Sequence, residues 1–217
     1  MSHAKSTGSE SMSRAALLRE LGYGHPDAAG RALEILVAAG LTNPRKDGIA
    51  TAKRERVREE LGQWLVRLCE RCAPSRVDDG RERVPVADHT DCERCLGSAN
   101  RAAIDRAVEV LRGAHRRRLV VVGGSPGVHE ALRKLWPEDM ELRIIDGTER
   151  HTGQEARGHL AWADAIVVWA SSELNHKVSE HYTGAPDPLR QKVTIVPRRG
   201  IEALAVELAA RFGRPAK

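Results

Sequence analysis

Residues 118–136 read RLVVVGGSPGVHEALRKLW: an apolar run, a glycine-rich turn and a segment with helical spacing. We expect Leu119–Val122 to form a buried strand and Gly123–Gly124 to form the turn, with Ser125 as the N-cap of a helix and Pro126 at its first position. The same order recurs toward the C-terminus, where strands are predicted at 141–147, 164–172 and 192–200 and helices at 152–163, 174–184 and 201–213.

Strands that alternate with helices of about ten residues indicate parallel βαβ units with right-handed crossovers. Parallel strands are covered by helices on both faces, which agrees with the continuous apolar runs LVVV and AIVVW. The sequence therefore predicts an α/β fold, with a small, four-stranded, parallel, Rossmann-like sheet over residues 118–217.

The ends of these predicted strands carry residues that suit an anion. Glycines allow close approach of the backbone, and a helix N-terminus offers backbone N–H groups and a partial positive charge to phosphate. Asp146 lies about twenty residues further on, where dinucleotide-binding domains hold a ribose, although with Thr148 it would equally form a strand-exit turn and a helix cap. The third strand end adds Ser171, Ser172 and Lys177. The predicted ligand-binding residues are Gly123, Gly124, Ser125, Gly127, Asp146, Asn175, His176, Arg198 and Arg199.

Three stretches of this region, LVVVGGSP, WADAIVVWASSELNHKVSEHY and VTIVPRRGI, carry a family resemblance. Together they resemble an uncharacterised bacterial Rossmann-like family, a domain of unknown function with V-G-G after its first strand and an (S/N)H element after a middle strand. The resemblance covers the C-terminal half of the chain. It implies a fold and a crevice, with Gly123, Gly124, Asn175 and His176 as the matching positions, and no particular chemistry.

The chain has only four cysteines, Cys69, Cys72, Cys92 and Cys95, in two copies of the tetrapeptide C-E-R-C. Two C-x2-C pairs separated by about twenty residues are typical of a four-thiolate zinc site. We expect a zinc ribbon over residues 69–97 with one structural Zn²⁺ per chain, because four protein ligands leave no open position for catalysis. Independent thiols or a redox pair are alternatives, and His89 could replace one ligand, although the four cysteines already complete the shell.

Residues 14–68 are predicted to be helical, with a basic turn, TNPRKDG, at 42–48 and a longer helix that runs from Thr51 directly to Cys69. The phrase LEILVAAGLTNPRKDG resembles the recognition helix and wing of many bacterial regulators, so this segment resembles a reduced winged helix. The stretch GYGHPDAAG leaves little room for the short helix that should come before, so a helical bundle packed on the zinc module or on a partner stays an alternative. The predicted nucleic-acid contacts are Arg31 in the groove and Arg45, Lys46, Lys53, Arg54 and Arg56 on phosphates.

Composition and charge set limits on the remainder. A formal charge of +5 permits a polyanionic partner, and Arg71 and Arg94, inside the tetrapeptides, would equally contact nucleic acid or pair with neighbouring acids. The polar segment 1–13 is expected to be a disordered tail, and 98–117 a linking helix. We predict a cytoplasmic protein without membrane contact, because no apolar run approaches the roughly 20 residues of a membrane span and the N-terminus lacks an apolar signal.

Three functions are compatible with these features. The first is a nucleic-acid-binding bacterial regulator with a structural zinc, whose Rossmann-like domain senses a nucleotide or another phosphorylated ligand, as a homodimer or as a subunit of a complex. The second is an enzyme acting on a nucleotide or nucleic-acid phosphate, with His176 and Asp146 as acid–base groups; a missing nucleophile and catalytic metal argue against it. The third is a non-catalytic accessory subunit of a larger bacterial assembly.

Overall fold

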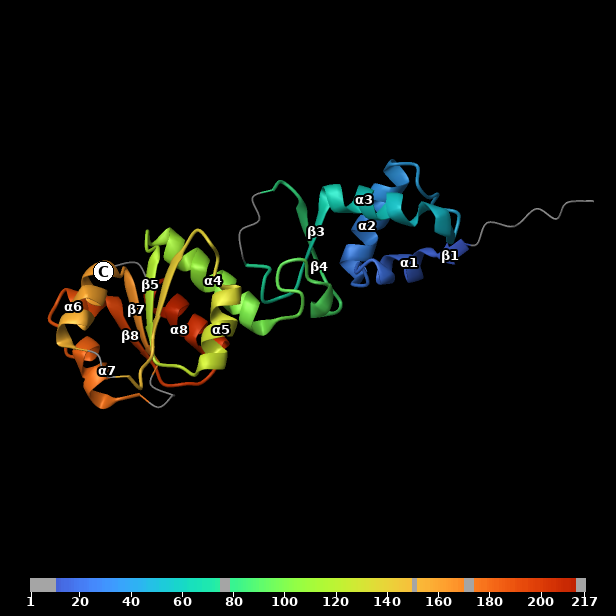
Figure 1. Ribbon diagram of the computed structural model, residues 1–217. Coiled ribbons are helices and arrows are strands. Elements are labelled where there is room, and N and C mark those ends of the chain that lie inside the picture. Colours follow the sequence, from blue (N-terminus) through green and yellow to red (C-terminus); the bar gives the residue numbers. More distant parts are fainter. Residues whose placement is uncertain (1–10, 75–78, 150–151, 170–173, 214–217) are drawn as a thin grey trace, which may run out of the picture. The chain divides into compact units, whose positions relative to one another are not determined.

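The computed structural model describes residues 11–74, 79–149, 152–169 and 174–213. The chain divides into two compact units, residues 1–98 and 99–217 (Figure 1). The boundary between the units falls after Ser98, the first residue of the segment 98–117 that the sequence predicts as a linking helix. Among the described residues, no helix is long and apolar enough to cross a membrane.

The second unit is built on a four-stranded parallel sheet of β5 (Arg118–Val122), β6 (Glu141–Ile145), β7 (Ala165–Trp169) and β8 (Val193–Val196), in the order β6-β5-β7-β8. Every residue of the central strand β7 is buried, as expected for a strand covered on both faces. The predicted α/β fold class is confirmed.

Helices cover both faces of this sheet: α5 (Pro126–Leu135), α6 (Gly153–Trp162), α7 (His176–Thr183) and α8 (Ile201–Phe212). Alternate residues of β5 belong to different cores. Val121 packs with residues of α5 and α8, whereas Val120 packs with residues of α6 and α7. A short 3-10 turn, Leu189–Lys192, leads into β8.

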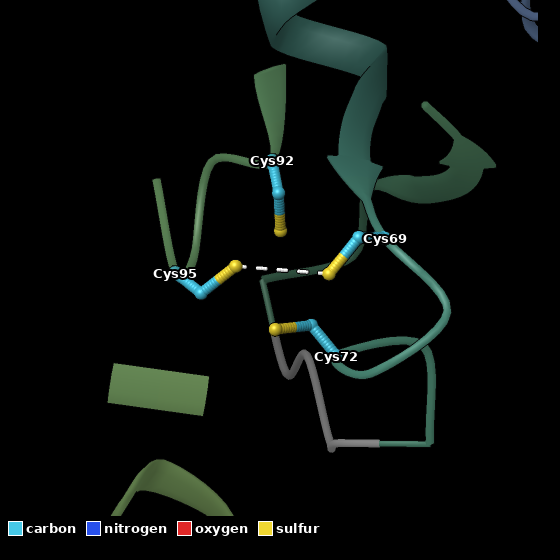
Figure 2. A group of neighbouring side chains, drawn as sticks. All are labelled: Cys69, Cys72, Cys92 and Cys95. Atoms are coloured by element: carbon cyan, nitrogen blue, oxygen red, sulfur yellow. Dashed lines mark hydrogen bonds between the residues drawn. The ribbon is translucent and has the colours of Figure 1, made fainter. Parts of the chain in front are cut away.

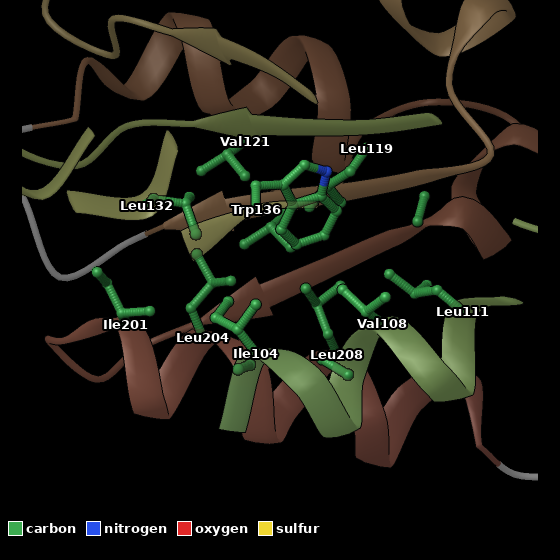
Figure 3. Packing of buried hydrophobic residues seen from close by; sticks show 14 of the residues in the cluster. Ile104, Val108, Leu111, Leu119, Val121, Leu132, Trp136, Ile201, Leu204 and Leu208 are labelled. Atoms are coloured by element: carbon green, nitrogen blue, oxygen red, sulfur yellow. The ribbon is translucent and has the colours of Figure 1, made fainter. Parts of the chain in front are cut away.

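Helix α4 (Ala99–Gly113) is part of the second unit rather than a linker. Its residues Ile104, Val108 and Leu111 are buried in one core with Leu204 and Leu208 of α8 (Figure 3). The apolar stripe of α4 is therefore covered by α8 and the sheet, which is why the helix belongs to this unit and not to a connection between units.

The first unit begins with β1 (Ser11–Ser13), α1 (Arg14–Glu20) and α2 (Pro26–Ala38), followed by β2 (Gly48–Ala50), a 3-10 turn η1 (Thr51–Lys53) and α3 (Arg54–Trp64). Strands β1 and β2 pair antiparallel. Residues 11–13 thus form a strand where the sequence predicts the end of a tail, because Met12 lies opposite Ile49 and packs against the helical core.

The long helix predicted to reach Cys69 ends at Trp64. Residues Leu65–Leu68 form β3 instead, which pairs in parallel with β4 (Glu82–Pro85), and a 3-10 turn η2 (His89–Asp91) follows. Leu65, Val66 and Leu68 are all buried, and pairing with β4 supplies backbone hydrogen bonds to the extended chain. Tertiary pairing here overrides the helical pattern of the preceding residues.

Candidate functional site

The four cysteines converge at the end of the first unit. Cys69 follows β3 directly and Cys92 follows η2 directly, and all four side chains are buried. Their Sγ atoms point toward one another and lie within 4.8 Å of each other, with Cys69 and Cys95 3.6 Å apart (Figure 2). The two tetrapeptides thus build one cluster.

Each pair of cysteines lies on a tight backbone turn. The Cys72 N–H donates to the Cys69 carbonyl over 2.9 Å, and the Leu96 N–H donates to the Cys92 carbonyl over 3.0 Å. The second turn is completed by Gly97 at φ +81°, where an added Cβ would lie 3.2 Å from Thr90. Local turns of this kind aim both thiols of a C-x2-C pair inward.

The donor set and the spacing fit a metal ion such as zinc. With Zn–S bonds of about 2.3 Å, a tetrahedron places its sulfurs about 3.8 Å apart. The distances between the four Sγ atoms come close to that value, and all four cysteines are buried. Thiolates are soft ligands of the kind that zinc binds. Four thiolates would fill a tetrahedral shell and leave no position for substrate.

The thiols have perturbed acidities. Burial, followed by the nearby Cys92, raises the pKa of Cys72. In Cys92, burial also raises the pKa, but backbone N–H groups of Cys95, Cys69 and Arg94 outweigh it and lower the pKa to about 7. A bound divalent cation deprotonates its thiol ligands outright, so metal binding by this cluster releases protons.

The second C-E-R-C tetrapeptide, residues 92–95, forms the second knuckle of the cluster. It connects the cluster to the helical part of the unit through Glu93. Its carboxylate accepts hydrogen bonds from the guanidinium groups of Arg67 and Arg81, each over 3.0 Å. Arg67 in turn donates to the carbonyl of Leu21, at the C-terminus of α1, and lies over the ring of Tyr23. Sequence reasoning missed this role because Glu70 and Glu93 occupy the same position in identical tetrapeptides.

The predicted nucleic-acid contacts lie on α2, on the turn that follows it and at the start of α3, and they differ in their partners. Arg45 and Lys46 are exposed on that turn, and Arg56 is exposed on α3. Arg31 forms ion pairs with Glu34 and Glu82, at 2.7 and 2.8 Å, and Arg54 pairs with Glu20. Two carboxylates therefore engage the Arg31 guanidinium in the free protein. Its contact with a groove of nucleic acid stays a prediction.

A short helix does precede α2. Helix α1 has seven residues and is capped by the hydroxyl of Ser13, and residues 21–25 connect it to α2. Gly22, at φ +84°, makes the turn, and His25 caps α2 by accepting the Asp27 N–H. Helix α1 thus lies before the stretch GYGHPDAAG, which itself holds only the turn and the first residues of α2.

At the second unit, the strand ends β5, β6 and β7 lie side by side. An added Cβ on Gly147 would lie 2.9 Å from the Cα of Gly123, and the Asn175 N–H donates to the Gly147 carbonyl over 2.9 Å. Gly124 packs against Trp169, whose indole N–H donates to the Arg198 carbonyl over 2.9 Å. The predicted ligand residues thus share one edge of the sheet.

Several of these residues also have local structural roles. Asp146 accepts the backbone N–H and the hydroxyl of Thr148, at 2.9 and 2.7 Å, which is the strand-exit turn that the sequence left as an alternative. Asn175 caps α7 by accepting the Lys177 N–H. Ser125, Gly127 and His176 are exposed at helix starts, and Arg198 and Arg199 are exposed before α8. Ser171 and Ser172 lie outside the described residues.

Sequence reasoning missed His129, which is buried on α5 beneath the glycine turn. Its Nε2 atom lies 2.9 Å from the Gly123 carbonyl, and an added Cβ on Gly124 would lie 2.9 Å from the same nitrogen. No motif in the sequence marks this histidine. Packing inside the unit therefore requires a glycine at position 124, which is also a position suited to a ligand.

Comparisons with protein-family models, with curated proteins and with solved structures find no match for this chain. The resemblance of its C-terminal half to a bacterial family stays a prediction. What the protein does is therefore argued from the chemistry of its own residues.

Proposed function

We propose that this chain is a nucleic-acid-binding regulator that contacts phosphates through its first unit. The observation that carries the proposal is the helix pair α1–α2, joined by a turn with Gly22 and Gly24 and followed by the basic turn at 42–48. Two helices joined by a short glycine-containing turn form the helix-turn-helix motif, whose second helix enters the major groove.

The charges around this helix pair favour contacts with the backbone of nucleic acid over reading of bases. Arg45, Lys46 and Arg56 are exposed, and none of them has a carboxylate partner within the described ranges. By contrast, the exposed face of α2 carries Asp27 and Glu34, and its arginine is already paired. We therefore expect modest sequence specificity and strong dependence on salt.

A structural Zn²⁺, one per chain, is the metal we propose for the cysteine cluster. Zinc would hold β3, β4 and the second knuckle together, and through Glu93 and Arg67 it would stabilise the end of α1. Four-cysteine zinc sites contribute directly to folding, because the unfolded chain has no preformed site.

The regulatory input we propose is a nucleotide or another phosphorylated ligand at the edge of the second unit's sheet. In the order β6-β5-β7-β8 the chain direction of the crossovers reverses between β5 and β7, and open α/β sheets bind ligands outside the carboxyl ends at such a point. Gly123 and Gly124 leave β5 there, directly before the N-terminus of α5. A homodimer would present two helix pairs to one duplex.

The test is a fluorescence anisotropy titration of the zinc-loaded full chain with duplex DNA, single-stranded DNA and RNA over a series of salt concentrations. We expect binding that weakens steeply with salt. Replacing Arg45 and Arg56 together with Gln should reduce the slope of log K against log salt by about two, because each phosphate contact on duplex DNA contributes about 0.9.

The matched control is Arg58→Gln on the same helix, since Arg58 already pairs with Glu55 at 2.9 Å. This variant removes one charge but should lower the slope much less than the double variant. Absence of binding to all three nucleic acids at low salt, by a folded and zinc-loaded chain, would overturn the proposed function.

A further inference from the structure

The turn between α2 and β2 encloses a hollow of about 400 Å³. The hollow lies within the first unit, between the C-terminal end of α2 and the start of the 3-10 turn before α3. Its lining includes Leu41, Thr42, Asn43, Lys46, Ala50 and Lys53.

The lining of this hollow is positively charged. Within the described part of the chain, Lys46 and Lys53 are the charged residues of this lining, and no carboxylate belongs to it. The neighbouring acid, Asp47, is almost fully exposed and pairs with Arg14 at 3.5 Å. Two ammonium groups around a concave surface without a counter-charge favour an anion.

Thr42 supplies a second and independent observation. Its hydroxyl oxygen is buried and has no hydrogen-bond partner. Buried hydroxyl groups in native proteins are nearly always hydrogen-bonded, so the unpartnered hydroxyl of Thr42, a residue that lines the hollow, makes it a candidate donor to a group bound there. A hydroxyl can donate its proton to an anionic oxygen.

The start of the following helical segment has no side-chain cap. Ala50 is the N-cap of η1 and Lys53 is the N-cap of α3, and neither forms a side-chain capping hydrogen bond. Both residues line the hollow. Oxygens of an anion are suitable acceptors for such N–H groups, which carry the positive end of the helix dipole.

The position of Lys53 also has a purely structural explanation, which needs no ligand. The Lys53 ammonium group donates to the Leu41 carbonyl over 3.3 Å, which satisfies an acceptor at the C-terminus of α2. An ammonium group has three donors, so this contact leaves others for a ligand. The two explanations differ in what they predict for Thr42 and Lys46, which do not cap α2 in this way.

We propose that this hollow binds a phosphate group, with Lys46 and Lys53 as its cations and the Thr42 hydroxyl as a donor. As a phosphate subsite for the backbone of nucleic acid, the proposal rests on the proposed function. As a site for a free phosphate or a mononucleotide it does not. The chemistry is the same in both cases, and the ligand titrations distinguish the two sources.

The experiment follows backbone amide resonances of the zinc-loaded full chain by NMR during separate titrations with sodium phosphate, a mononucleotide and a short DNA duplex, with sodium chloride as the ionic-strength control. We expect phosphate and the duplex to shift the amides of Thr42, Asn43 and Thr51, and chloride to leave them unchanged. Thr42→Val should weaken phosphate binding by about tenfold or more, the loss typical of one hydrogen bond to a charged group, while Thr42→Ser retains it.

Lys46→Gln combined with Lys53→Gln should abolish the shifts, whereas Lys134→Gln, an exposed lysine of α5, should not change them. Thr42→Val should keep the protein folded, because it removes a buried hydroxyl that has no hydrogen-bond partner. Weaker binding by this variant would therefore not be the result of unfolding. Its urea midpoint should equal or exceed that of the natural chain.

The outcomes separate the two proposals. Shifts with phosphate or the mononucleotide, together with no binding of duplex DNA, single-stranded DNA or RNA in the anisotropy titration, would support the hollow and overturn the proposed function. Binding of the duplex that is unaffected by the Thr42→Val and double-lysine variants would overturn the hollow and leave the proposed function standing. No shifts with any of the three ligands would overturn the hollow as well.

Discussion

Glu93 is the residue through which the cysteine cluster reaches the rest of its unit, and its counterpart Glu70 provides a built-in control. Glu93 is about one-quarter exposed and accepts hydrogen bonds from Arg67 and Arg81. Glu70 is exposed and has no ion-pair partner within the described part of the chain. Glu70 and Glu93 therefore occupy the same position in identical tetrapeptides but differ in burial and in ion pairing.

We predict that Glu93→Gln lowers the free energy of unfolding of the first unit by about 1–3 kcal/mol, because the partly buried Arg67 guanidinium loses its carboxylate partner and Arg81 keeps only Asp79. Glu70→Gln should change it by less than about 0.5 kcal/mol, as is usual for surface substitutions. Urea denaturation of the zinc-loaded chain measures both. Equal effects of the two substitutions would show that the Glu93 network does not stabilise the unit.

Asp164 has a comparable role in the second unit, where it joins the starts of β5 and β7. Its carboxylate accepts the backbone N–H groups of Arg117 and Arg118, each over 3.0 Å, and the Arg118 guanidinium over 3.0 Å. Partial burial raises the pKa of Asp164, but the Arg118 guanidinium and these N–H groups outweigh it and hold the pKa below its ordinary 3.8.

A lowered pKa in the folded state means that the ionised carboxylate stabilises the fold above pH 3.8 and that this stabilisation is lost as the pH falls through the folded pKa. We predict that Asp164→Asn costs about 1–2 kcal/mol at pH 7, from weakened charge-assisted hydrogen bonds. The difference between the natural chain and the variant should stay constant down to about pH 5 and shrink below about pH 4. Urea titrations at several pH values test this, and a difference independent of pH would contradict it.

At the scale of elements, the segment from β5 into α5 contains two glycines that differ in their tolerance of a side chain. Gly124 has φ +97°, and an added Cβ would lie 2.9 Å from His129 and 3.0 Å from Trp169. Gly127, in the first turn of α5, has open space around it. Both lie in the glycine-rich motif from which the sequence predicts a ligand site.

We predict that Gly124→Ala destabilises the second unit by about 2–4 kcal/mol, since backbone strain and a close contact add together. Gly127→Ala should leave stability unchanged or raise it by about 0.4–1 kcal/mol, because alanine restricts the unfolded chain. Thermal unfolding followed by circular dichroism distinguishes the variants. A tolerated Gly124→Ala would mean that His129 and Trp169 move apart without cost.

The observed limits of the helices and strands show which elements could not be predicted from the local sequence. The four strands of the sheet and the helices between them were predictable, because their apolar runs are short, β-branched and bounded by glycine or proline. The strand β3 was not, because Leu65–Leu68 continues the apolar pattern of α3 and becomes extended only by pairing with β4. Such a pairing depends on residues 17 positions away, as in the register Leu65 with Glu82.

At the scale of the molecule, α4 decides where the second unit begins. Four of its buried residues, Ile104, Ala107, Val108 and Leu111, belong to the core beneath the sheet. We predict that a fragment of residues 99–217 folds cooperatively, whereas a fragment of residues 118–217 does not. Loss of α4 exposes its apolar partners on α8, and each large buried side chain contributes about 1.5–3 kcal/mol, so the total approaches the whole stability of a typical domain.

Circular dichroism and urea denaturation of the two fragments provide the measurement, and the longer fragment serves as the control for the shorter. A cooperative transition in residues 118–217 with the midpoint of the longer fragment would contradict the assignment of α4 to the core. It would instead favour the linking helix that the sequence predicts.

The sequence alone determined the α/β class, the parallel strands and the convergence of the cysteines, because these follow from local periodicity and from the fixed spacing of metal ligands. Only the tertiary structure decided that α4 is a core helix, that Arg31 and Arg54 are engaged by carboxylates, and that Glu93 differs from Glu70. The physical reason is that burial and ion pairing depend on which distant segments meet. Thr42 and Lys53, for example, acquire their shared hollow only when β2 pairs with β1 and folds the turn back onto α2.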